Sequence, residues 1–194
     1  NVITPELTRE LAAAVERIAS EPGIKGAIIT SGKPGSFVAG ADLKAFNDAQ
    51  AVEPGTPDFL DRAFGLFEEL ASFPKPVIAS LNGITLAGGL EMAMCADLIV
   101  ASETARIGDA HANFGVFPGG GGAAVLPRVI PLHTAMYLLF TGKALGAAEM
   151  KSLGLVCEVH PPAELAEATL NLARGIARRS PVPLRRLEEV GRAT

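Results

Sequence analysis

The sequence has 194 residues, of which 48% are hydrophobic and 20% charged, a composition typical of a folded globular chain and not of a disordered one. A formal net charge of -4 gives no indication of binding to nucleic acid or to an anionic membrane surface. Glu91 and Asp97 interrupt the longest apolar stretch, so we expect no membrane span. Two cysteines, Cys95 and Cys157, are too few for a disulfide framework, which favours reduced thiols and a cytoplasmic protein.

The first predicted element is a helix that begins at Pro5, because Thr4 can act as its N-cap and proline suits the first helical position. It ends at the run Glu21-Pro22-Gly23. Its apolar stripe comprises Leu7, Leu11, Ala14, Val15 and Ile18.

Further along the chain, short apolar runs alternate with stretches of helical periodicity, and residues 47–58 are expected to be a mobile surface segment. Strands are predicted at 24–30, 77–81, 98–101 and 155–160, and helices at 59–73, 87–95, 121–128, 132–141, 147–153 and 163–179, with a last helix from Pro183. This alternation predicts an α/β fold with a largely parallel sheet.

Glycine is over-represented, with 21 residues, several of them in clusters. The run Gly119 to Gly122 has neither a Gly-x-Gly-x-x-Gly pattern after a strand nor a Gly-Lys-Ser/Thr ending, so a phosphate loop is disfavoured. We interpret it as a tight turn that leads into a helix.

The pair Gly88-Gly89 precedes Glu91 at a predicted helix N-terminus, where free N–H groups favour negative charge. A carboxylate beside such N–H groups suits proton transfer next to a carbonyl, although a glutamate in a first helical turn can also be simply a favourable charge. The loop Val38 to Asp42, which follows a strand, offers further backbone donors. Two such loops could together form an oxyanion hole.

These residues carry a resemblance to the enoyl-CoA hydratase/isomerase (crotonase) superfamily, and the match extends over nearly the whole chain. The motifs that resemble it are Phe37 to Leu43, Pro76 to Ala79 with Asn82-Gly83, Ala87 to Ala93, Asp97 to Ala101, Pro118 to Gly122, Leu139 to Gly142 and Gly154 to Val156.

The resemblance implies a crotonase-like spiral of ββα units, as in the ClpP/crotonase fold, in one domain over residues 1–194. It also implies an acyl-CoA thioester as substrate, no cofactor apart from that coenzyme A moiety, and a homotrimer or dimer of trimers. The thioester oxygen would lie between the N–H groups of Ala39 and Gly88, and Ala39, Gly40, Ala41 and Asp42 would line the coenzyme A path. Family members extend beyond both ends of this sequence, so we expect the first strands and part of the C-terminal helices to be missing.

One position departs from the family pattern. Hydratases of the family use two glutamates; the first corresponds to Glu91, whereas the second position is occupied by His111 in the run Gly108-Asp109-Ala110-His111. An imidazole can serve as general acid or base near neutral pH, and Asp109 is close enough in sequence to orient it. We therefore expect Glu91 and His111, with the donors Ala39 and Gly88, to be catalytic.

The leading hypothesis is a lyase or isomerase that acts on an enoyl-CoA through an enolate. The replaced glutamate keeps open a hydrolase or a retro-Claisen enzyme that cleaves a carbon–carbon bond, and a third alternative is a non-catalytic coenzyme A-binding paralogue. No spacing of His, Cys and carboxylates predicts a metal site.

Overall fold

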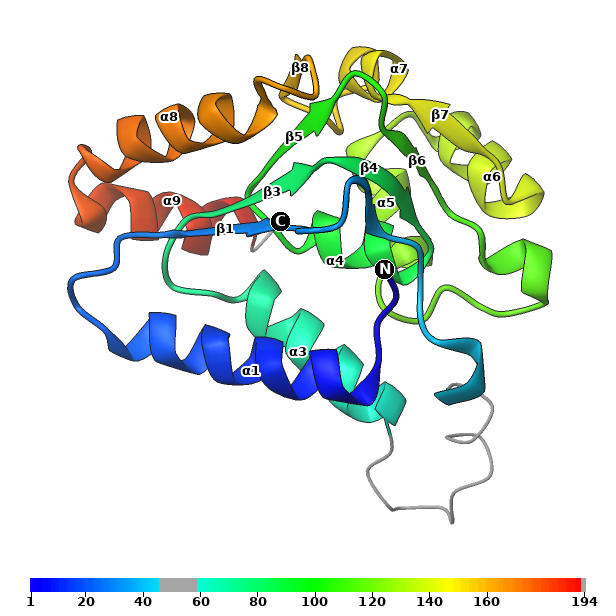
Figure 1. The fold of residues 1–194 in the computed structure, drawn as a ribbon, viewed down its shortest axis with the longest axis horizontal. Coiled ribbons are helices and arrows are strands. Elements are labelled where there is room, and N and C mark those ends of the chain that lie inside the picture. Colours follow the sequence, from blue (N-terminus) through cyan, green and yellow to red (C-terminus); the bar gives the residue numbers. More distant parts are fainter. Residues whose placement is uncertain (46–58, 193–194) are drawn as a thin grey trace.

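The computed structural model describes residues 1–45 and 59–192 (Figure 1). One sheet has the strand order β1-β3-β5-β8, all parallel, and its strands are β1 (Ala27–Thr30), β3 (Val77–Leu81), β5 (Leu98–Ser102) and β8 (Glu158–His160). A second sheet has the order β2-β4-β6-β7, with only β7 antiparallel to its neighbour; its strands are β2 (Gly35–Val38), β4 (Gly83–Leu86), β6 (Arg106–Gly108) and β7 (Ala144–Gly146).

The chain alternates between the two sheets: β1, β3 and β5 enter the first sheet, and the strand that follows each of them enters the second. A helix follows β2 and β4, and a 3₁₀ helix follows β6, so the same ββα unit recurs along the chain. This arrangement confirms the predicted crotonase-like spiral.

The helices pack around the two sheets (Figure 1). They are α1 (Pro5–Ser20), α3 (Phe59–Ala71), α4 (Gly88–Met94), the 3₁₀ helix η1 (His111–Phe114), α5 (Gly122–Val129), α6 (Leu132–Thr141), α7 (Ala147–Ser152), α8 (Leu165–Ala177) and α9 (Pro181–Arg192). Helices α1 and α3 lie side by side, and α8 packs on the first sheet through Leu165 and Ile78. Helix α4 lies at the centre, where every residue from Gly88 to Ala93 is buried.

Most elements agree with the sequence prediction. Thr4 caps α1 by accepting the N–H of Leu7 at 3.1 Å, and β3 has the predicted bounds. Strands β2, β4, β6 and β7 were not predicted, because each has only three or four residues and contains a glycine. At one of these glycines, Gly83, a Cβ would overlap the carbonyl of Gly35 in the neighbouring strand, so the close strand contact requires glycine.

Within the described residues, no helix combines the length and the apolarity that crossing a bilayer requires. The expected mobile segment, 47–58, lies outside the described residues.

Candidate active site

The turn between β4 and α4 brings the chain into the core at two glycines. Ala87 has φ 50° and ψ -122°, an unusual backbone conformation for a residue with a side chain, and α4 begins at the next residue. A Cβ at Gly89 would overlap the carbonyl oxygen of Val38, whereas a Cβ at Gly88 would meet only the tip of Ile3, at 3.1 Å. Gly89 is therefore required for packing, and Gly88 lines an open cavity.

Glu91 lies in the first turn of α4 and is only 3% exposed. Its Oε1 accepts the N–H of Gly122 at 2.9 Å. Burial raises the pKa of Glu91 above its usual value, against the N–H groups of Gly122 and Gly120 and the imidazole of His111, which favour the charged form. The glycine run that we interpreted only as a turn therefore also holds this carboxylate.

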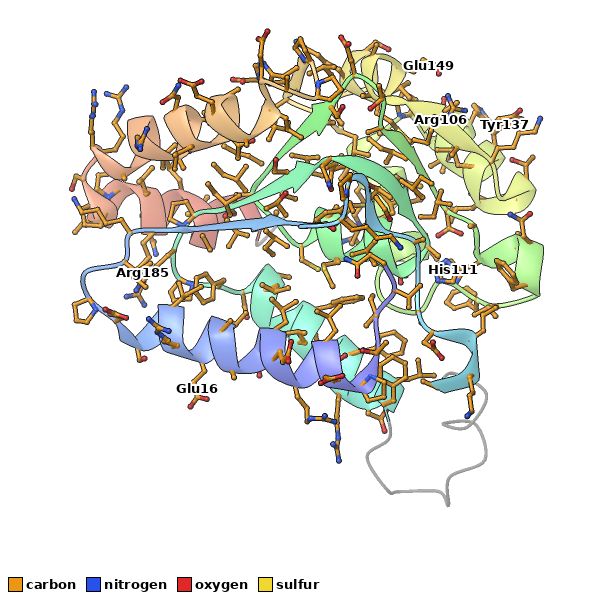
Figure 2. The ribbon with its side chains drawn as sticks, viewed as in Figure 1. Glu16, Arg106, His111, Tyr137, Glu149 and Arg185 are labelled. Carbon is orange, nitrogen blue, oxygen red and sulfur yellow. The ribbon has the colours of Figure 1, made fainter. Side chains whose placement is uncertain are left out.

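The chain after β6 leads into η1, whose first residue is His111 (Figure 2). Nε2 of His111 lies 3.7 Å from Oε2 of Glu91, and Nδ1 lies 2.9 Å from Oδ2 of the fully buried Asp109. Burial by itself lowers the pKa of His111, but the hydrogen bond and charge of Asp109, together with the charge of Glu91, raise it above its usual value. The imidazole thus lies between two carboxyl groups.

A cavity of about 390 Å³ connects the residues expected to form the site. Its lining includes all of those residues: Ala39, Gly40, Ala41, Asp42, Gly88, Glu91 and His111. Apolar side chains of α3 and of the segment after η1 complete the wall, among them Phe64 and Phe117.

The N–H of Ala39, expected to point at a thioester oxygen, instead donates to the backbone carbonyl of Asn1 at 2.9 Å. The N–H of Ala41, two residues later, lies 3.9 Å from the position that a Cβ at Gly88 would take. Within residues 1–45 and 59–192, the N–H groups of Ala41 and Gly88 form no hydrogen bond. Because Ala41 and Gly88 both line the cavity and their backbones lie close together, their N–H groups are candidate donors to a bound oxygen.

Asp42 also has a local role that its position in the motif did not indicate. Its N–H donates to Ile3, and its Oδ1 accepts the N–H of Ala45 at 2.9 Å. Ile3 and Ala41 form an isolated parallel bridge, so the segment before α1 supports the loop from behind. The described residues contain no group of three or more His, Cys, Asp or Glu side chains that could hold a metal ion.

Two sheets joined by repeated ββα units, with a buried carboxylate beside free N–H groups, define the chain as a protein of the crotonase fold. Solved structures agree. An enoyl-CoA hydratase from Bacillus anthracis superposes with a TM-score of 0.89 at 32% identity, covering 97% of this chain and 72% of that one. An enoyl-CoA hydratase subunit from Geobacillus kaustophilus gives 0.89 at 34% identity over 99% of this chain and 73% of that one.

The family model described as enoyl-CoA hydratase/isomerase matches residues 1–194. The chain belongs to the enoyl-CoA hydratase/isomerase family. A probable enoyl-CoA hydratase from Rhizobium meliloti is 40% identical over 91% of this chain, and the mitochondrial methylglutaconyl-CoA hydratase of Mus musculus is 34% identical over 95% of it. The matches span 67% and 60%, respectively, of the lengths of these two relatives.

Proposed function

We propose that this chain catalyses hydration or isomerisation of an acyl-CoA thioester through an enolate. The observation that carries the proposal is the 3.7 Å separation between Oε2 of Glu91 and Nε2 of His111 at the wall of the cavity. One atom about 2.8 Å from both groups would be within hydrogen-bond distance of each. A substrate water or a reacting proton can therefore contact an acid and a base together.

The enolate oxygen would be held by the N–H groups of Gly88 and Ala41 in place of the Gly88 and Ala39 pair expected from the sequence. A thioester α-proton is too weakly acidic for an unassisted carboxylate, so the developing charge needs fixed donors. Each such donor contributes about 3–4 kcal/mol to transition-state stabilisation. The coenzyme A moiety would follow the loop from Ala39 to Asp42, which lines the same cavity.

The pair formed by Glu91 and His111 suits hydration when it holds one exchangeable proton. Oxygen of water bonds to Cβ while one of its protons passes to the basic partner, and the acidic partner donates its proton to Cα. Burial raises the pKa of Glu91, so we assign Glu91 as the acid and His111, when its Nε2 is unprotonated, as the base. The net proton content of the pair is unchanged, so the reverse reaction uses the same groups.

A second candidate is hydrolysis of the thioester, favoured by the contact between Asp109 and His111. An imidazole backed by a carboxylate is suited to activating water against a carbonyl carbon. Retro-Claisen cleavage would use the same water on a β-keto thioester.

The two reactions are separated by one paired assay on a panel of acyl-CoA substrates. Hydration removes the absorbance of the conjugated enoyl thioester without releasing a thiol, whereas hydrolysis releases free coenzyme A. We expect the first signal and its loss in Glu91→Gln. Calorimetric binding of acyl-CoA with neither signal would instead identify a non-catalytic binding protein.

For assembly, we propose a trimer or a pair of trimers. Apolar side chains are exposed on and beside η1 and α6, including Phe114 at 60%, Phe117 at 75% and Phe140 at 74%. Burial of these rings at a subunit contact would be favourable. Sedimentation equilibrium checks this proposal, and a monomer at micromolar concentration would contradict it.

A further inference from the structure

Asp109 directs both of its carboxylate oxygens at His111. Oδ1 accepts the backbone N–H of His111 at 3.1 Å, and Oδ2 lies 2.9 Å from Nδ1 of its ring. The carboxylate is fully buried. Because both oxygens of this buried carboxylate contact His111, the contact fixes the position and orientation of the imidazole; losing it would leave a buried charge without these hydrogen bonds.

The contact also determines where the ring carries its proton. An ionised carboxylate can only accept, so Nδ1 must donate, and in a neutral imidazole the other nitrogen then carries a lone pair. That nitrogen, Nε2, is the atom 3.7 Å from Oε2 of Glu91. The lone pair therefore faces the wall at which the reacting atoms would bind.

We propose that Asp109 is a positioning residue that holds His111 as the Nδ1–H tautomer, and that His111 Nε2, not Glu91, takes the proton from the attacking water. In the step, an O–H bond of water breaks, its proton bonds to Nε2, the oxygen bonds to the substrate, and Glu91 gives its proton to Cα. This assignment of base and acid rests on the proposed function, whereas the tautomer does not.

The glycine run packs against the carboxyl groups of both Asp109 and Glu91. A Cβ at Gly122 would lie 3.0 Å from Oδ2 of Asp109 and 3.1 Å from Oε1 of Glu91, so its backbone is fitted against both carboxyl groups. Among the residues that the structure describes, the other charged side chains that line the cavity are Asp42 and Lys44, while α3 contributes apolar groups such as Phe67.

The negative charge of Asp109 also affects the pKa of His111. Burial opposes charge on His111, and the negative charge of Asp109 opposes that effect, so His111 has a raised pKa. Asparagine at 109 would remove this charge and could donate to Nδ1, which would move the ring proton to Nε2. Activity that requires neutral His111 would then begin at a lower pH, yet with the lone pair facing away.

The tautomer is tested without turnover, by nitrogen NMR of protein labelled on its histidines, with His111→Gln used to assign the resonance. We expect Nδ1 protonated and Nε2 unprotonated in the native protein above the pKa of His111, and a change toward Nε2–H in Asp109→Asn. An Nε2–H tautomer in the native protein, or identical spectra in the two proteins, would overturn the proposal.

Steady-state kinetics then test the role of Asp109 in positioning His111. Asp109→Asn should lower kcat at least about tenfold, change KM little, and move the acidic limb of the pH–rate profile downward. Asp97→Asn is the matched control, since Oδ2 of Asp97 accepts the backbone N–H of Val77 at 2.7 Å away from the cavity lining. If Asp109→Asn lowered the rate but left both the acidic limb of the pH–rate profile and the tautomer of His111 unchanged, Asp109 would have only a structural role. A native protein without turnover would refute the proposed function, and the NMR result would still decide the tautomer.

Discussion

The side chain of Glu91 accepts a hydrogen bond from the backbone of Gly122, a residue 31 positions further along the chain, at 2.9 Å. The contact joins the first turn of α4 to the start of α5 and makes the glycine run part of the site. It holds one carboxylate oxygen and leaves the other, Oε2, facing His111.

A methyl group at Gly120 should disable this arrangement. A Cβ there would lie 2.6 Å from Oε2 of Glu91 and 2.9 Å from the ring of Phe67, so the carboxylate would have to move. We expect Gly120→Ala to lower kcat/KM by about 100-fold or more, comparable with losing a general acid or base. Gly119→Ala is the control, because its Cβ would only touch Phe64 at 3.4 Å. Equal activities of the two variants would count against the role of the loop.

Adjacent glycines at the start of α4 should respond differently to alanine. Gly89→Ala should prevent folding or cost more than about 3 kcal/mol, because its Cβ overlaps the Val38 carbonyl. Gly88→Ala should fold, since the tip of Ile3 can shift, but its methyl would stand 3.9 Å from the Ala41 N–H, where a thioester oxygen is expected. Thermal melts and acyl-CoA turnover distinguish these outcomes, and an active Gly88→Ala enzyme would contradict the proposed donor pair.

The buried Glu91 should also make stability depend on pH. Its pKa is raised in the folded state, so its favourable contribution is complete below its usual value of 4.5 and is lost as pH rises through the folded-state pKa. In thermal melts, Glu91→Gln should therefore be more stable than the native protein at pH 8, with a free energy of unfolding higher by about 1.4 kcal/mol for each unit of pKa difference. At pH 4 the two proteins should be about equally stable. Glu68→Gln, on an exposed position of α3, is the control. A Glu91→Gln protein that is less stable at pH 8 would show that burial of this carboxylate is not penalised.

Restoring the second carboxylate of the family pattern tests the role of His111. In His111→Glu, the base loses its proton at lower pH than an imidazole does, so the acidic limb of the pH–rate profile should move downward. His111→Gln, which cannot accept a proton, should lose about 100-fold or more in kcat. Unchanged activity in the glutamine variant would exclude His111 from proton transfer.

Much of this fold could be predicted from local sequence. Strand β3 and helix α1 stood out because an apolar run or stripe is bounded by proline, glycine or a capping threonine. Strands β2, β4 and β6 could not be predicted, because three or four residues carry no periodicity and their stability comes from partners far along the chain.

Some features of the site could likewise be predicted from the sequence, and others could not. Glu91 and His111 were identified from motif positions, and the structure places both at one cavity. The hydrogen bond from Gly122 to Glu91 could not be predicted, since no local pattern pairs two residues that lie 31 positions apart. The same holds for Ala39, whose N–H is taken by Asn1 across a contact that only the folded chain creates.

Enolate chemistry at Glu91 and His111 is tested most directly by turnover of an enoyl-CoA in deuterated water, followed by mass spectrometry of the product. The native protein should form a 3-hydroxyacyl-CoA carrying one deuterium at Cα, and Glu91→Gln should form it at least about 100 times more slowly. An equal rate of deuterium incorporation in the two proteins would contradict the account.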